Sequence, residues 1–393
     1  MAQHLRGLGL RVRTGIAGTG VVAELDGAGP GPVIGLRADM DALPIKENTQ
    51  LVFASRTRSR YRGTEVDVMH ACGHDGHTAI LMAVADVLTQ LRSRLPGTVV
   101  FYVQPAEEGP SDFVPDGTRS WGARLMIEEG VLAAPRPDAV LGLHLTSKRR
   151  SGQIAYRPGP LTASSDDLRI KVFGQQTHAA SPWHGVDPIV LSAHAITALQ
   201  TVVSRECNAN ESPTVLTIGT IHGGVRNNIL APSVEMEGTL RTFDRTLRTK
   251  AHSSVRSKVA HTIAAGGGRA EVEILEKYSV TVNDPALTDR ALPALRWAAN
   301  GDLVLCERVT GSEDFSCFAD EVPGLFFLVG AMPQDKNMET AAPNHSAEFD
   351  IDESALQVGV RALCAVTVDL LRSLSATDQA TRAKRGEPSG GTP

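Results

Sequence analysis

The stretch "HTAILMAVADVLTQLRSRLPGTVVFYVQ", residues 77–104, decides the fold class. Its first half predicts an amphipathic helix, because apolar residues recur at helical spacing: Ile80, Leu81, Val84, Val87, Leu88 and Leu91. Its second half, "TVVFYVQ" at 98–104, is a continuous apolar run rich in β-branched and aromatic residues, which is typical of a buried strand. A helix followed closely by a buried strand indicates an α/β protein.

Similar apolar runs occur elsewhere in the chain. They are "PVIGLRA" at 32–38, "DAVLGLH" at 138–144 and "GLFFLVG" at 324–330. Buried strands that alternate with helices are typical of a mostly parallel sheet flanked by helices. We therefore expect one discontinuous domain of this α/β type, formed by residues 1–164 and 278–375.

The pattern changes between residues 165 and 277. There the order is strand, helix, strand, strand, helix, strand, which is the arrangement of a ferredoxin-like α+β sandwich. Because α/β elements resume after it, we expect this segment to be a second domain inserted into the first. The last residues, 376–393, are polar and rich in Gly, Pro and Ser, so we expect a disordered tail.

Composition excludes several classes of protein. A length of 393 residues suits two domains, and the net charge of -5 offers no basic surface for nucleic acid. The five cysteines are odd in number and scattered, which favours a reducing compartment over a disulfide framework. We see no secretory leader and no apolar segment approaching the roughly 20 residues that span a bilayer. We therefore expect a cytoplasmic protein with no membrane or nucleic-acid partner.

Polar clusters follow the predicted strands. "ADMDALP" (38–44), "PAEEG" (105–109) and "PNHSAEF" (343–349) each come after a strand, and His144 ends another. "HACGHDGH" (70–77) leads into the helix. In open α/β sheets sites form beyond the carboxyl ends of the strands, so we expect these clusters to meet at one edge.

Taken alone, "HACGHDGH" fits a metal site, a thiol nucleophile with its base, or a polar turn that caps the helix near His77. The neighbouring Glu107 and Glu108 favour a metal, because adjacent carboxylates after a buried strand repel each other unless a cation is near. The combination of Cys, His and Glu side chains is a ligand set that Zn, Mn, Ni or Co accepts.

Eight motifs in order carry a resemblance over nearly the whole chain: "LRADMDALPI", "HACGHDGHTA", "QPAEEG", "GLH", "THAASPWHGVDPI", "EGTLRTF", "GSEDFS" and "NHSAEF". The chain resembles the amidohydrolase branch of the dinuclear metallopeptidase family that contains aminoacylases, carboxypeptidase G, hippurate hydrolases and plant auxin-conjugate hydrolases. The resemblance implies a catalytic α/β domain with an inserted lid or dimerisation domain. It also implies hydrolysis of N-acyl amino acids or related conjugates with two divalent metal ions (Mn, Zn, Ni or Co), and a homodimer formed through the lid.

The resemblance also implies roles for individual residues. The expected metal ligands are Cys72, His74, Glu108, His144 and His345. Glu107 would be the general base and then the general acid, and Asp41 the carboxylate that orients a ligand or Glu107. In the inserted domain His178 would reach the substrate carbonyl, and Asn228 and Arg241 would bind substrate.

Three features of the sequence remain outside this assignment. His70 has no role, Asp75 and His77 are interpreted as helix-start residues, and Ala231 stands where the family commonly has proline. Family members usually carry an N-terminal helix before the "LGLRV" segment, where this sequence starts. We expect either that the start site is wrongly placed or that the protein is truncated, with an effect on stability or activity. Two other functions stay open: a hydrolase with Cys72 as its nucleophile, and a non-catalytic metal- or ligand-binding protein on the same fold.

Overall fold

The computed structural model describes residues 1–112 and 119–384. The chain forms two compact units. The first contains Met1–Gly159, Val282–Glu307 and the chain from Cys317 onward, and the second contains Pro160–Thr281 and Arg308–Ser316. We expected 308–316 in the first domain, but backbone hydrogen bonds from Val309 to Leu161 (2.8 Å) and from Ala163 to Gly311 (2.9 Å) tie it to the second unit.

The first unit is built on an eight-stranded mixed sheet with the order β1-β2-β6-β3-β7-β16-β8-β15. Its four central strands, β6, β3, β7 and β16, are mutually parallel and include all four predicted runs. The parallel centre and flanking helices confirm the predicted α/β class. The outer strands β1, β2 and β8 run antiparallel to their inner neighbours and were not predicted. The bounds are β1 Arg11–Ile16, β2 Gly20–Asp26, β3 Val33–Asp39, β6 Thr98–Gln104, β7 Ala139–Arg150, β8 Ile154–Tyr156, β15 Leu303–Leu305 and β16 Gly324–Met332.

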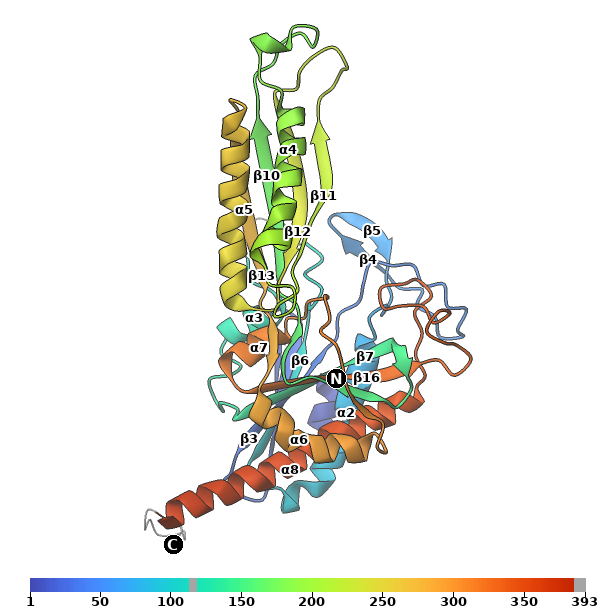
Figure 1. The fold of residues 1–393 in the computed structure, drawn as a ribbon. Helices are drawn as coiled ribbons and strands as arrows, with labels where there is room; N and C mark the ends of the chain where they lie inside the picture. The colour runs from blue at the N-terminus through green and yellow to red at the C-terminus, as the bar shows by residue number, and fades with distance from the viewer. Residues whose placement is uncertain (113–118, 385–393) are drawn as a thin grey trace. The chain divides into compact units, whose positions relative to one another are not determined.

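Helices α2 (His74–Leu91), α6 (Pro285–Ala298) and α8 (Ser354–Lys384) pack together along this sheet (Figure 1). Ile80, Leu81 and Leu88 of α2 are fully buried in the core that these helices share with the strands. A second layer includes α7 (Phe315–Glu321), whose Phe318 ring lies 5.4 Å from that of Tyr102 in β6. Smaller elements complete the unit: α1 Ala2–Gly7, α3 Gly122–Glu128 and the hairpin β4 Arg58–Tyr61 with β5 Thr64–Asp67.

Helix α8 differs from our expectation in two ways. Its segment Ser354–Ser375 is long and apolar enough to cross a membrane by length and composition, which we had not recognised. Leu363, Val366 and Leu370 lie buried in the core of the first unit, so the apolar side of this helix already has a protein partner. The helix also continues to Lys384, although we expected disorder from residue 376, whereas 385–393 lie outside the described residues.

The second unit has the predicted element order: β10, α4, β11, β12, α5, β13. Its four strands form an antiparallel sheet in the order β11-β12-β10-β13, and α4 and α5 lie side by side against it (Figure 1). This unit has its own apolar core. The bounds are β10 Ser165–Phe173, α4 Pro188–Thr201, β11 Val215–Gly223, β12 Ser233–Arg241, α5 Arg245–Ala265 and β13 Arg269–Tyr278. Strands β9 (Gly159–Thr162) and β14 (Thr281–Asn283) lie where the chain passes between the units.

Candidate metal centre

The site forms where strand β3 ends beside the longer strand β7. The β3–β7 ladder runs only to the pair Arg37 and Gly142, while β7 continues to Arg150 against β16. His144 is therefore inside β7 and not its last residue, which corrects our interpretation of "DAVLGLH". Asp39 and Asp41 lie at the end of β3, and Glu107 and Glu108 follow β6. These residues meet at the carboxyl ends of the parallel strands, as the sequence predicted.

Helix α2 presents the motif "HACGH" to this edge. The helix begins at His74, one turn earlier than we expected, and Gly73 before it has φ of 89°, a left-handed conformation that glycine adopts without strain. Both Cys72 and His74 are buried, with 6% and 1% of their surfaces exposed. The segment at the start of α2 therefore places two buried side chains, a thiol and an imidazole, beside His144 of β7 and beside Asp41 at the end of β3.

His345 reaches the site from the loop after β16. Its backbone N–H donates to the carbonyl of Ala71 (2.7 Å), which fixes the loop against the "HACGH" segment. His345 itself has φ of 69°, a conformation that costs a non-glycine residue of order 1–3 kcal/mol and that persists where surrounding contacts impose it. The loop thus holds this histidine in a fixed and strained position.

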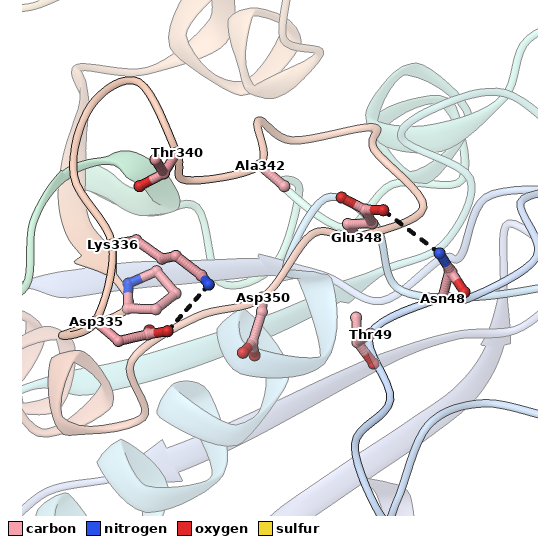
Figure 2. Close-up of a pocket in the computed structure, with 9 residues that line it drawn as sticks. Asn48, Thr49, Asp335, Lys336, Thr340, Ala342, Glu348 and Asp350 are labelled. Atoms are coloured by element: carbon pink, nitrogen blue, oxygen red, sulfur yellow. Dashed lines mark hydrogen bonds and ion pairs between the residues drawn. The ribbon is translucent and has the colours of Figure 1, made fainter.

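A surface hollow of about 340 Å³ shows how the same loop is anchored (Figure 2). The backbone N–H of Asn48 donates to Ala347 (2.8 Å), and its side-chain amide lies 3.4 Å from Glu348. The lining residues are Asn48, Thr49, Pro333, Asp335, Lys336, Thr340, Ala342, Glu348 and Asp350. None of them is a predicted ligand, so we interpret the hollow as part of the loop's anchorage.

Cys72 lies at the centre of the candidate ligands. Its Sγ is 3.2 Å from Nε2 of His345 and 3.4 Å from Nε2 of His144. The same His345 nitrogen is 2.8 Å from Oε1 of Glu108. Three overlapping groups of side chains have ligand atoms within 4.8 Å of one another: Cys72, His74 and His144; Cys72, Glu108 and His345; His74, Glu107 and Glu108. The structure thus brings together all five predicted ligands and the predicted base.

Asp41 connects two sides of this cluster. Its Oδ1 accepts from Nδ1 of His74 (3.1 Å), and its Oδ2 accepts from the backbone N–H of Glu108 (2.9 Å). Its backbone carbonyl also accepts from Nδ1 of His70 (3.0 Å), which gives the unassigned His70 a partner. Asp41 therefore orients one imidazole and the peptide that carries Glu108, the kind of support that metal ligands require.

The charges of the cluster depend on these contacts. Burial alone would raise the pKa of the Cys72 thiol, but His144 and His345 outweigh it and lower the pKa to about 3. Hydrogen bonds to Cys72 and Glu108 raise the pKa of His345 to about 10. Burial opposes the charged form of His74, yet Asp39 and Asp41 raise its pKa well above the ordinary value. Without a cation, the site therefore holds a thiolate and two imidazolium groups.

The residues present fit divalent metal ions. Nδ1 of His74 is bonded to Asp41, whereas its Nε2 is buried, has no hydrogen-bond partner in the described part of the chain and lies 3.8 Å from an Asp39 oxygen. A buried imidazole nitrogen without a hydrogen-bond partner, beside a thiolate and carboxylates, is placed to bind a metal ion once it gives up its proton. Thiolate, imidazole and carboxylate together suit the borderline-soft divalent ions.

Three predicted substrate-binding residues lie in the second unit. His178 and Asn228 are exposed and adjacent, since His178 forms a β-bridge with Ile229 and the Asn228 carbonyl accepts from Ala179 (3.1 Å). Arg241 ends β12, donates to Ser312 of the "GSEDFS" motif (2.9 Å) and to Thr239 (3.0 Å), and has its pKa lowered by burial. The structure places His178 and Asn228 together and ties Arg241 to Ser312.

Sequence reasoning missed the buried group around His77. We interpreted His77 as a helix-start residue, but it lies within α2 with 2% of its surface exposed, and burial lowers its pKa to about 4. Its partners are Asp39 and the backbone of Leu145. The available signal was its spacing, because His74 and His77 are three residues apart and share one face of a helix.

A model of the peptidase family M20/M25/M40 matches residues 35–369. The chain belongs to this family. Thermostable carboxypeptidase 1 of Saccharolobus solfataricus is 37% identical over 364 residues, which cover 92% of this chain and 87% of that protein. N-acetylcysteine deacetylase of Bacillus subtilis is 36% identical over 357 residues, covering 91% and 86%. A solved dinuclear metal-binding M20 peptidase of Bacillus subtilis matches with a TM-score of 0.75 and 32% identity, covering 94% and 90%.

Membership of the M20/M25/M40 family confirms the resemblance that the motifs predicted. It also confirms the expected class of activity, metal-dependent hydrolysis of amide bonds.

Proposed function

We propose that this M20/M25/M40 enzyme holds two divalent cations with Cys72, His74, Glu108, His144 and His345. The observation that carries the proposal is the overlap of the three ligand groups. They share Cys72, His74 and Glu108, and no single group contains all five ligands, which supports two adjacent cation positions over one. Mn, Zn, Ni and Co all accept this donor set, and their availability decides among them.

We further propose that the substrate is an N-acyl amino acid or a related conjugate, a class supported by the name of the Bacillus subtilis deacetylase relative. When bound, the cations supply a water of lowered pKa and polarise the substrate carbonyl. The carboxylate of Glu107 is 6% exposed and belongs to the same group as His74 and Glu108. Glu107 takes the proton of the attacking water and returns it to the leaving amine nitrogen.

The second unit contributes substrate contacts in this proposal. Nδ1 of His178 accepts from the backbone N–H of Ala180 (3.0 Å), so a neutral His178 carries its proton on Nε2 and can donate it to a carbonyl oxygen. Arg241 uses Nε and Nη1 for Thr239 and Ser312, and its remaining N–H groups can bind a carboxylate. Asn228, exposed beside His178, offers an amide to the substrate.

Hydrolysis of N-acetyl, N-benzoyl and indole-acyl amino acids by wild type and Glu107→Gln tests the proposal. We expect the variant to lose about 10²–10⁴-fold in kcat, because the proton transfer is removed, while its metal content stays that of wild type. Glu348→Gln, on the loop that carries His345, is the matched control and should remain active. Equal activity of Glu107→Gln and wild type would exclude this role for Glu107. If wild type and variant were equally inert on the whole panel, a non-catalytic binding protein would be the better interpretation.

One observation favours a second candidate. The low pKa of Cys72 and its contacts with His144 and His345 form a thiolate–imidazolium group of the kind that cysteine hydrolases use as nucleophile and base. Such an enzyme would keep full activity after complete removal of metal. The metal-dependent reaction would stop and would return when the metal is restored.

We also propose that the chain is a homodimer through the second unit. Strand β11 is an edge of its sheet, and exposed apolar side chains gather on β11, the residues after it and α4: Ile189, Val190, Ile221 and Val225. The Ile189 side chain lies beside Gly224, which joins these positions into one patch. An unpaired edge with apolar neighbours is a surface that another chain can cover. Light scattering should give twice the chain mass of 41.8 kDa, and Ile221→Lys should shift it towards a monomer. A wild-type monomer would contradict the proposal.

We propose a cytoplasmic location, because all five cysteines are free. Fractionation of source cells tests it, and recovery of the protein outside the cytoplasm would contradict it.

A further inference from the structure

We propose that His77 is a positioning residue for the metal centre: it holds the backbone N–H of Leu145, and the carbonyl of the same residue fixes the ring of His144 with Nε2 facing Cys72. The inference rests on the proposed function, in which His144 is a metal ligand. It assigns a role to His77, and to Asp39 and Arg37 behind it.

Two charged residues next to His77, Arg37 and Asp39, have completely buried side chains. Nη1 of Arg37 donates to Oδ2 of Asp39 (2.8 Å), and both side chains have no exposed surface. Nε of Arg37 donates to Oε1 of Gln104 (2.8 Å), and Oδ1 of Asp39 is 2.6 Å from Nδ1 of His77. A buried carboxylate held by an arginine in this way is a fixed acceptor for the imidazole.

The hydrogen bonds determine which nitrogen of His77 carries the proton. The backbone N–H of Leu145 donates to Nε2 of His77 (2.8 Å), and an N–H group can only donate. Nε2 therefore has the lone pair, and the proton is on Nδ1, where it is donated to Asp39. Asp39, His74 and His77 lie close enough together to hold an ion. Because both His77 nitrogens are occupied by protein, we assign His77 to positioning and not to ligation.

The backbone of Leu145 connects His77 to His144. Its carbonyl accepts from Nδ1 of His144 (2.7 Å) and from the side-chain amide of Asn344 (3.2 Å). Because Nδ1 of His144 donates to this carbonyl, Nε2 is the nitrogen left to bind a cation, and it lies 3.4 Å from Sγ of Cys72. One residue, Leu145, thus has its N–H fixed by His77 and its carbonyl bonded to the candidate ligand.

The path of the strands explains why side chains supply the hydrogen-bond partners of the Leu145 backbone. The β3–β7 ladder ends at Arg37 opposite Gly142, three residues before Leu145. Beyond that point the backbone N–H of Leu145 donates to His77, and its carbonyl accepts from His144 and Asn344. Loss of His77 leaves a buried N–H without its acceptor and lets the backbone dihedrals of Leu145 change, which moves its carbonyl away from His144.

The test compares two substitutions of His77. The Oε1 atom of His77→Gln can still reach the Leu145 N–H, whereas His77→Asn is too short to do so. Zn²⁺ affinity is measured by competition with a chromophoric chelator, together with the visible spectrum of the Co²⁺-loaded protein. We expect His77→Asn to bind Zn²⁺ about 10–100-fold more weakly, with a changed Co²⁺ spectrum, and His77→Gln to stay close to wild type.

His252→Asn is the matched control, because His252 is a shielded histidine in ion-pair contact with Asp166 (3.1 Å) in the second unit. It should lower the melting temperature and leave Zn²⁺ affinity unchanged. If His77→Asn behaved like this control, the inference would be wrong although wild type binds metal. A wild type that binds no Zn²⁺ would instead overturn the proposed function. Should neither His77 variant fold, ¹⁵N NMR of the metal-free wild type decides: a proton on Nε2 of His77, or no proton on Nδ1 of His144, contradicts the inference, and protons on both Nδ1 atoms with none on Nε2 of His77 support it.

Discussion

At the scale of single residues, the site is defined by opposite charges held close together. Cys72, with a pKa of about 3, is a thiolate at neutral pH, and His345, with a pKa of about 10, is protonated. A cation that binds Cys72 meets a ligand already deprotonated. A cation that binds His345 must first displace a proton.

Metal affinity should therefore rise with pH. The raised pKa of His345 means that its proton competes with the metal at every pH below about 10 and stops competing above it. His74 is also protonated, so each of these two imidazolium groups that binds metal releases one proton, and affinity increases about tenfold per pH unit for each proton. Chelator competition at several pH values measures the slope, and calorimetry in buffers of different ionisation enthalpy counts the protons. A flat profile would show that His345 is not a ligand.

At the scale of elements, the metal centre forms because β7 extends beyond the end of β3 and because α2 begins at His74. Gly73 joins Cys72 to that helix with φ of 89°, and a Cβ there would lie 3.5 Å from Leu145 and from Phe349. The turn before α2 thus sets the relative positions of two candidate ligands.

Gly73→Ala should lower the free energy of unfolding by about 1 kcal/mol, the cost of a left-handed alanine, and should also weaken Zn²⁺ binding. Gly63→Ala is its control, since Gly63 has φ of 79° in the β4–β5 hairpin and open space around it. It should show the stability loss alone. Urea denaturation and chelator competition measure the two effects. Equal metal affinity in the two variants would contradict the role given to Gly73.

The elements also show which parts of the fold and of the site could be predicted from the sequence. The central strands and α2 were predictable because their apolar residues are continuous or recur at helical spacing, and the motif order placed the ligands. Strand β1 was missed because "RVRTGI" is mostly exposed and polar. The length of β7 was missed because its last residues, "SKRR", are polar and pair only with β16. The role of His77 depends on a backbone N–H at Leu145, which no side-chain pattern reveals.

At the scale of the whole molecule, the second unit has a core and a buried ion pair of its own. Asp166 in β10 is fully buried and accepts two hydrogen bonds from Nε and Nη2 of Arg248 in α5. Burial raises the pKa of Asp166, but His252 and Arg248 outweigh it, so the net pKa is lowered. The pair fastens a helix to the centre of the sheet.

Asp166→Asn should destabilise the second unit by about 3 kcal/mol, because Arg248 and His252 would lose their buried charge partner and Arg248 would be left with Glu276, which is exposed. Because the folded-state pKa of Asp166 is below its unfolded value, the stabilisation is present above about pH 4 and is lost as pH falls through the folded-state pKa. Urea denaturation across acid pH measures this. The wild-type advantage over Asp166→Asn should shrink as the pH falls, and an advantage that does not change with pH would contradict the assignment.

If two cations bound to one side-chain cluster make this chain a hydrolase, its activity depends on its metal content. The most direct test removes all metal with a chelator, confirms the loss by elemental analysis, and then follows hydrolysis of an N-acyl amino acid as Mn²⁺ or Zn²⁺ is added back. We expect no hydrolysis without metal and full activity at two ions per chain. Full activity with fewer than one ion per chain would contradict this expectation.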